Sequence, residues 1–263
     1  MRRKTTAVRI GNVVLSSEEP VLVQSMLNTS TREVDACVEQ AIRIIEAGGR
    51  LVRITAPGVK EAEMLGEIHR RLRERGYTTP ISADIHFVAE AASVAARYVE
   101  KVRINPGNFA DKRATFKKLT YTDEEYAAEL EILRQKFTEF LEVCRQYGTA
   151  VRIGTNHGSL SDRIMSRYGD TPAGMVEATM EYLRVCQACD FKDVVISLKS
   201  SDCRTMVDAV RLLVEKMEAE GMCYPLHLGV TEAGEGEDGR IRSAVGIGTL
   251  LNEGIGDTIR VSL

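Results

Sequence analysis

Arginines flanked by aliphatic residues lie in four of the strand-like segments of this sequence. The same pattern at Arg9 precedes the first predicted strand, and we expect a surface or structural role for it. The segments LVRIT, KVRIN, AVRIG and TIRVS contain Arg53, Arg103, Arg152 and Arg260. Their β-branched composition is typical of strands that are covered on both faces. An unpaired guanidinium buried in such a strand is costly, so each arginine requires an anion, either a carboxylate of the protein or a bound ligand.

The charges near these segments favour a bound anion over internal ion pairs. Lys199, in VVISLKSSD, adds a fifth cation, whereas Asp84 and Glu232 are the main carboxylates at matching strand ends. A planar guanidinium suits phosphate oxygens, and several cations in one place suit a di- or polyphosphate. The pattern therefore predicts a site for a phosphorylated small molecule, with Arg–carboxylate pairing as the alternative.

Other polar residues follow the same segments and could contact that ligand. Amide and hydroxyl side chains can grip phosphates and hydroxyl groups. A metal site made by three histidines with Asp84 is conceivable, but the first strand lacks the HxH pair that is usual in metal-dependent barrel hydrolases. We therefore expect neutral histidines that hydrogen-bond the ligand or a loop, and no metal site. The residues concerned are Asn105, Asn156, Ser262, His86, His157 and His227.

Glu232 is the one carboxylate that lies in a glycine-rich loop at a strand end, in HLGVTEAGEG. A carboxylate among cations stays ionised, which suits proton transfer or the orientation of a hydroxyl group. An ion pair with the arginines is the simpler role, and the two roles are compatible. We therefore treat Glu232 as the candidate catalytic residue.

Strand-like and helical segments alternate along almost the whole chain. Eight βα units in a chain of this length are typical of a (β/α)₈ TIM barrel, whose active sites lie at the C-terminal strand ends. An open doubly wound sheet is the alternative. The Gly-Asn turn in AVRIGNVV predicts an N-terminal β-hairpin that closes the bottom of the barrel. The predicted strands span residues 21–26, 51–56, 81–87, 101–106, 150–155, 194–199, 226–231 and 258–263.

Two features depart from a complete barrel. Residues 107–121 read as a long basic loop after the fourth strand, and no helical segment follows the eighth strand. A barrel without its last helix exposes an apolar flank. We therefore expect residues 1–263 to be one substrate-binding barrel domain, cut from a longer protein.

Composition excludes several other classes of protein. The 263 residues carry a formal net charge of −3, which argues against a general nucleic-acid-binding surface. No apolar run is long enough for a membrane span or a signal peptide, so we expect a cytoplasmic protein. The six cysteines lack the spacing of a secreted disulfide framework, so we expect reduced thiols.

The combined motifs resemble one enzyme family, the 4-hydroxy-3-methylbut-2-en-1-yl diphosphate synthases of the methylerythritol phosphate route to isoprenoids. The matching segments run through nearly the whole chain. They are VQSMLNTSTREVDA, LVRITAPG, ISADIHF, KVRINPGN, VRIGTNHGSLSDRIMSRYGDTPAGMVEA, DVVISLKSSD, LHLGVTEAGEG and SAVGIGTLLNEGIGDTIRVSL. The resemblance implies a TIM barrel that binds 2-C-methyl-D-erythritol 2,4-cyclodiphosphate. It also implies an oxidoreductase that opens the ring reductively with loss of water, using electrons from flavodoxin or ferredoxin through a [4Fe–4S] cluster.

Roles for individual residues follow from the same resemblance. Glu232 would face the cluster across the substrate, as proton donor or hydroxyl-orienting group, while Asn105 and Asn156 help to position the substrate. Asp84 and the three histidines would support these contacts from behind. The residues that would hold the diphosphate are Arg53, Arg103, Arg152, Lys199, Arg260 and Ser262.

The resemblance also shows what this chain lacks. In the family, three cysteines and a glutamate of a C-terminal domain hold the cluster, and no cysteine spacing in this sequence replaces them. The segment after the fourth strand resembles the longer form, in which a spacer domain would begin beyond Leu263. We therefore expect residues 1–263 to bind substrate without redox activity or a bound metal of their own.

Two other functions remain open on the sequence alone. One is a self-contained phosphate-binding barrel enzyme, such as a pterin-type transferase or an aldolase with Lys199 as its amine. The other is a regulatory sensor of a phosphorylated metabolite, which would leave Glu232 without a clear role.

Overall fold

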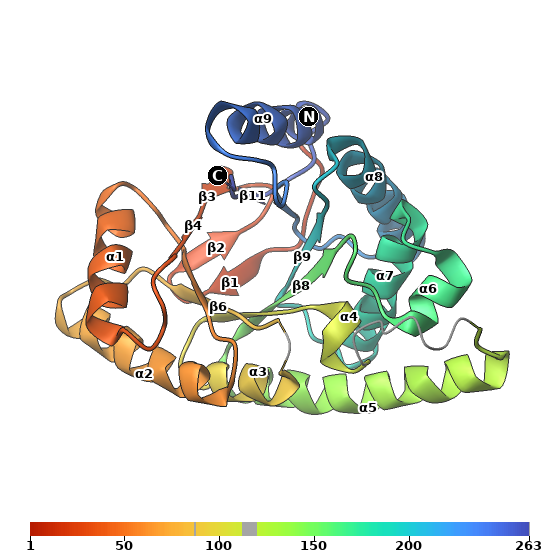
Figure 1. Ribbon diagram of the computed structural model, residues 1–263, viewed down its shortest axis with the longest axis horizontal. Helices are drawn as coiled ribbons and strands as arrows, with labels where there is room; N and C mark the ends of the chain where they lie inside the picture. The colour runs from red at the N-terminus through yellow and green to blue at the C-terminus, as the bar shows by residue number, and fades with distance from the viewer. Residues whose placement is uncertain (87, 112–119, 263) are drawn as a thin grey trace.

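Eight parallel strand positions form a closed ring (Figure 1). The computed structural model describes residues 1–86, 88–111 and 120–262. One hydrogen-bonded run of strands joins β10 (His227–Leu228), β11 (Thr258–Ile259) and β3 (Leu22–Val23). The other run joins, in order, β4 (Ser25–Met26), β5 (Val52–Thr55), β6 (Ile81–Asp84), β7 (Lys101–Ile104), β8 (Ala150–Asn156) and β9 (Val194–Lys199).

Two junctions close the ring between these runs. Only Gln24 separates β3 from β4, so the two form one barrel position. A parallel bridge between Ile196 and Leu226 joins β9 to β10. Every predicted strand is therefore present in the predicted order. The (β/α)₈ barrel is confirmed, and the open sheet is wrong.

The helices lie around the outside of the ring (Figure 1). Outward residues such as Val102, Ile104 and Ile153 are fully buried in the main hydrophobic core against them. The helices are α1 (Val34–Glu46), α2 (Val59–Glu74), α3 (Ala89–Ala95), α4 (Pro106–Phe109), α5 (Asp123–Tyr147), α6 (Asp162–Tyr168), α7 (Pro172–Ala188), α8 (Cys203–Ala219) and α9 (Gly236–Asn252).

Local sequence signals explain where the longest of these helices begin. Thr122 and Glu125 form a reciprocal capping box at the start of α5, which satisfies backbone N–H groups that the helix cannot pair. Thr171 accepts a hydrogen bond from Gly174 N at the start of α7, and Pro172 occupies the first helical position. Such caps fix the point at which the chain leaves each loop above the barrel.

The N-terminal hairpin closes the bottom of the barrel, as predicted. Strands β1 (Val8–Ile10) and β2 (Val13–Leu15) pair antiparallel around a turn in which Gly11 has φ +58°. Their inward apolar side chains form a second hydrophobic cluster with residues from the N-terminal strand ends. This cluster seals the floor of the barrel with Leu22, Leu51, Ala150 and Val195.

The segment after β7 differs from the predicted loop in its first residues. Residues 106–109 form the short helix α4, capped by the side chain of Asn105, which accepts a hydrogen bond from Gly107 N. The prediction of a loop from residue 107 is therefore wrong at its start, because Asn105 and Pro106 together nucleate a helical turn. Residues 112–119 of that predicted loop, with residue 87 and residue 263 of two predicted strands, lie outside the described residues.

Within the described ranges, β11 is followed by no helix. Figure 1 shows β3, β4 and β11 on the side of the ring between α9 and α1. The outward side chains of Val23 and Val261 are 56% and 45% exposed there, which confirms the predicted apolar flank. In the part of the chain that is described, no helix is long and apolar enough to cross a membrane.

Asp257 reinforces the seam at which β10 joins the ring. Its carboxylate is buried and accepts hydrogen bonds from Leu226 N at 2.8 Å and from Thr5 Oγ1 at 3.0 Å. Arg2 Nη2 lies 2.8 Å from the same carboxylate. One side chain thus ties the N-terminal segment, β10 and β11 together.

Replacing Asp257 should open this seam. We expect Asp257→Ala to lower the free energy of unfolding by about 3 kcal/mol. The substitution leaves the buried Leu226 N–H without an acceptor and the Arg2 guanidinium without its counter-charge. Denaturant unfolding followed by circular dichroism measures the loss. Glu131→Ala, at an ion pair whose carboxylate is 67% exposed, serves as control and should change stability by less than about 0.5 kcal/mol. Equal stability of the two variants would contradict the role given to Asp257.

Candidate anion-binding site inside the barrel

Because side chains alternate between the two faces of each strand, one set of polar side chains faces the barrel interior and forms a layer there. Arg53 on β5, Asp84 on β6, Arg103 on β7 and Arg152 on β8 all face inward, and each is at most 7% exposed. In the strand register Asp84 lies beside Arg103, and Arg103 beside Arg152. Three of the arginines predicted at the strand ends therefore lie in the interior of the barrel, above the apolar floor.

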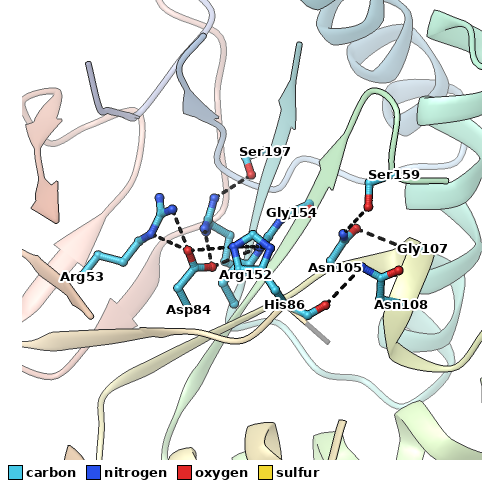
Figure 2. A network of polar contacts seen from close by, with 11 residues as sticks. Arg53, Asp84, His86, Asn105, Gly107, Asn108, Arg152, Gly154, Ser159 and Ser197 are labelled. Atoms are coloured by element: carbon cyan, nitrogen blue, oxygen red, sulfur yellow. Dashed lines mark hydrogen bonds and ion pairs between the residues drawn. The ribbon is translucent and has the colours of Figure 1, made fainter. Parts of the chain in front are cut away.

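Asp84 is the hub of this layer (Figure 2). Arg53 donates to Asp84 Oδ2 from Nε at 3.0 Å and from Nη2 at 2.7 Å. Arg103 Nη1 donates to Oδ1 at 3.1 Å, and Arg152 Nη2 lies 3.7 Å from the same oxygen. A single carboxylate thus contacts three guanidinium groups. The simple alternative of one carboxylate for each arginine is not what the barrel contains.

The protonation of Asp84 follows from these contacts. Burial pushes the pKa of this carboxyl group upward, but the charges of Arg53 and Arg103 outweigh burial and hold the pKa well below its usual range. Asp84 therefore stays ionised throughout the neutral range. It neutralises one positive charge and leaves the others.

The interior carries a clear excess of positive charge. Within residues 1–86, 88–111 and 120–262, Asp84 is the only carboxylate that forms an ion pair with these interior cations. Several buried donors have no protein partner in the same ranges, among them Arg53 Nη1, Arg103 Nε and Arg152 Nε. The basic side chains of the interior are Arg53, Lys101, Arg103, Arg152, Lys199 and the half-buried Arg260.

The pKa values of the outer cations reflect this crowding. Burial, together with Arg53 and Arg152, lowers the pKa of Lys199 well below its usual value. Burial and the charge of Arg53 lower the pKa of Arg260 to about 10. Buried cations that repel one another in this way are stabilised when an anion binds between them.

Two contacts across β8 and β9 fix the arginine orientations. Arg103 Nη2 donates to Gly154 O at 2.7 Å, and Arg152 Nη1 donates to Ser197 Oγ at 2.8 Å. Gly154 is required here, since a Cβ at this position would lie 2.5 Å from Arg103 Nε. These two acceptors are neutral, so they orient the arginines without adding negative charge to the site.

His86 forms part of the rim beside this cluster. Its Nε2 lies 3.2 Å from Asp84 Oδ2, and its ring contacts Arg103 Nη1. Its backbone carbonyl accepts from Asn108 Nδ2 at 3.2 Å (Figure 2). The interpretation of His86 as support for the arginines agrees with this geometry.

The other polar residues predicted from the sequence divide between the site and its loops. Asn105 is buried and donates to Ser159 Oγ at 2.9 Å, so its amide connects two loops at the rim (Figure 2). Asn156 ends β8 and is half-buried. His157 turns away from the cluster and contacts Asp170, with Nε2 3.2 Å from the Asp170 carbonyl oxygen.

Glu232 lies in the loop after β10 with an unusual backbone. Its φ is +50°, in the left-handed region that residues other than glycine rarely adopt, and its side chain is exposed. Such strain is concentrated at functional positions. Ser262 is half-buried at the end of the described chain, two residues beyond Arg260.

Two interior residues have a larger part in the site than the sequence indicated. Lys101 is completely buried and His227 is 1% exposed, and the described residues offer no partner to Lys101 Nζ or to either His227 ring nitrogen. Burial and the neighbouring Lys199 and Arg152 lower the pKa of His227 well below its usual value, so it is neutral. The signal for Lys101 was its place two residues before Arg103 in KVRIN, which puts both on one face of the strand.

The His, Cys, Asp and Glu side chains of the described residues form no cluster suited to a metal ion. His86, His157 and His227 have separate surroundings, and no group of three or more His, Cys, Asp or Glu side chains in the described ranges could hold a metal. The six cysteines are unpaired and three of them, Cys37, Cys144 and Cys186, are buried.

Removing the hub carboxylate should destabilise the ligand-free barrel. We expect Asp84→Asn to cost about 4 kcal/mol of unfolding free energy, because it leaves several buried guanidinium groups without a counter-charge. Calorimetric melting measures the effect, with Glu131→Gln at an exposed i,i+3 pair as control. Added pyrophosphate should restore more stability to Asp84→Asn than to the parent chain. A variant as stable as the parent would show that the arginines do not depend on Asp84.

Comparisons with known proteins agree with this geometry. The family model of the GcpE TIM-barrel domain matches residues 5–263. The 4-hydroxy-3-methylbut-2-en-1-yl diphosphate synthase (flavodoxin) of Parabacteroides distasonis is 64% identical over 262 residues, which cover 100% of this chain and 43% of that protein. The chloroplastic, ferredoxin-dependent synthase of Arabidopsis thaliana is 53% identical over 263 residues, with 100% and 36% covered.

Solved structures share only the fold. Dihydropteroate synthase of Xanthomonas albilineans superimposes with a TM-score of 0.59 at 15% identity, over 98% of this chain and 92% of that one. Type I 3-dehydroquinate dehydratase of Clostridium difficile gives 0.59 at 9% identity, over 97% and 88%. The chain spans less than half the length of the curated relatives that it matches. With a family model that covers nearly all of it and relatives of this similarity, the chain belongs to the GcpE TIM-barrel domain family.

Proposed function

We propose that this barrel binds 2-C-methyl-D-erythritol 2,4-cyclodiphosphate and supplies the substrate site of a 4-hydroxy-3-methylbut-2-en-1-yl diphosphate synthase. The observation that carries the proposal is the excess of buried cations over the single carboxylate of Asp84. A cyclic diphosphate presents two adjacent anionic groups, which matches several cations around one opening. The names of the curated relatives support the same substrate class.

Each site residue has a role in this proposal. Asn105 and Asn156 position the carbon skeleton from the rim, where Asn105 already fixes the loop beside Ser159. Glu232 orients a hydroxyl group or transfers a proton, since its carboxylate is exposed at the mouth of the barrel. Asp84 and His86 support the arginines, and His227 lies behind them near Lys199 and Lys101. His157 supports the loop at Asp170. The groups that bind the diphosphate are Arg53, Arg103, Arg152, Lys199, Arg260 and Ser262.

The electron transfer that this reaction requires would be carried out by groups other than the described side chains. Conversion of the cyclodiphosphate to 4-hydroxy-3-methylbut-2-enyl diphosphate takes up two electrons and two protons and releases one water. We propose flavodoxin or ferredoxin as the electron donor, because the relatives' names specify them. The [4Fe–4S] cluster that the family resemblance implies would be held by a part of the longer protein beyond this barrel. Residues 1–263 alone should then bind substrate without reducing it.

The transferase and aldolase alternatives have less support. The dihydropteroate synthase likeness, at 15% identity, concerns the fold alone. Lys199 lies beside Arg53 and Arg152, which favour a neutral amine there, but the same crowding serves anion binding equally well. Family membership therefore favours the cyclodiphosphate.

Calorimetric titration with the cyclodiphosphate tests the arginine assignments. We expect Arg152→Met and Arg260→Met each to weaken binding at least tenfold, because each removes a charge-assisted contact to phosphate. Arg9→Met, on the exposed face of the N-terminal hairpin, should bind like the parent chain. Unchanged affinity in both site variants would refute these assignments. Equal binding of an uncharged tetrol would refute the anion site as a whole.

Substitutions of Glu232 should affect stability and turnover in opposite directions, because its backbone is strained. We expect Glu232→Gly to raise the unfolding free energy by about 1 kcal/mol, since glycine tolerates φ +50°, whereas Thr231→Gly should lower it. In the longer, flavodoxin-reduced protein, Glu232→Gln should reduce turnover by about 100-fold or more with little loss of substrate affinity. Full turnover in Glu232→Gln would exclude a catalytic role.

A further inference from the structure

Lys101 is the buried basic residue for which the proposed function has no role. It is the first residue of β7 and points into the barrel on the same face as Arg103. Its side chain is 0% exposed, and in the described ranges its Nζ has no hydrogen-bond partner. A completely buried amine without a partner is rare in proteins, because it loses hydration without any compensating contact.

The surroundings of Lys101 come from every neighbouring strand and are mainly cationic. Arg53 and Arg152 repel its charge, and Asp84 is the carboxylate that attracts it. Asp84, however, already binds Arg53 and Arg103. Ser82 lies beside Lys101 in the strand register, and its Oγ is also buried without a partner among the described residues. His227 faces the same group from β10, and Lys199 from β9 is near His227.

This arrangement determines the charge of the ligand-free protein. Burial and the charges of Arg152 and Arg53 lower the pKa of Lys101 well below its usual value, which favours the neutral amine in the ligand-free barrel. A diphosphate bound above the arginines adds negative charge to the same low-dielectric interior. Its field favours the protonated amine and raises that pKa again.

We propose that Lys101 is a further residue of the anion site, a positioning group beneath the arginines that takes up a proton when the diphosphate binds. This inference rests on the proposed function, since it requires an anionic ligand in the barrel. Lys101 then supplies positive charge only when the ligand is present. The ligand-free barrel avoids one more buried charge, and the complex gains one.

The cyclodiphosphate is a suitable probe for this proton. Each of its phosphorus atoms carries a single ionisable oxygen of diester type, which is already ionised in the neutral range. Any proton taken up on binding therefore comes to the protein. Calorimetry at pH 8 in buffers of different ionisation enthalpy counts those protons directly.

Lys101→Met should change both binding and stability in a characteristic way. We expect about tenfold weaker binding and roughly one proton fewer taken up per ligand. Lys199 and His227 account for any proton uptake that remains. Without ligand, the variant should melt at a higher temperature than the parent, because methionine fills the site without an unpaired amine. A lysine of lowered pKa destabilises the fold below its unfolded pKa, so this gain should shrink as pH rises toward about 10.

Controls separate this inference from the proposed function. Lys192→Met, at a 71% exposed lysine, should match the parent in affinity, proton count and melting temperature. Lys101→Gln, which retains a donor but cannot ionise, should also lose the proton, and it serves if the methionine variant does not fold. Unchanged affinity and proton count in the Lys101 variants would overturn the role of Lys101 alone. Absence of binding to the parent chain would overturn the proposed function and this inference with it.

Discussion

The contact between the Asp84 carboxylate and the guanidinium groups of Arg53 and Arg103 organises the whole interior of this barrel. Two ion pairs of 2.7 and 3.1 Å hold these two arginines in fixed positions. The neutral acceptor Gly154 completes the orientation of Arg103, and Ser197 orients the neighbouring Arg152. One negative charge cannot neutralise so many cations. The carboxylate therefore shapes the site and leaves it electropositive, which is the condition for preorganised binding of an anion.

The apolar floor gives this charge its effect. The hairpin side chains Val8 and Ile10 pack with Leu22, Ala150 and Val195 and exclude water from below the polar layer. Charges above such a floor act in a medium of low dielectric, where each interaction is stronger than at a surface. The C-terminal mouth is the remaining approach for a ligand, as in other barrels of this fold. The hairpin thus contributes to electrostatics as well as to packing.

Much of this could be predicted from the sequence, because it depends on local signals. The β-branched runs and the Gly-Asn turn sufficed for the barrel and its hairpin, and the aliphatic–Arg–aliphatic pattern located most of the cations. Register and side-chain direction between strands are not local properties. For this reason the sequence did not reveal the sharing of Asp84 by three arginines, the buried state of Lys101, or the turn of His157 toward Asp170.

The same physics explains why the site is costly to the fold. A barrel interior filled with aliphatic layers would be more stable than one that holds unpaired Arg152, Lys101 and His227 atoms. Glu232 adds backbone strain at the rim. These unfavourable features lie together around the mouth and the polar layer, while the floor and the helix-covered face of the strands are mainly apolar. Their concentration in one region is what binding an anion from the mouth requires, because only there can a ligand relieve them.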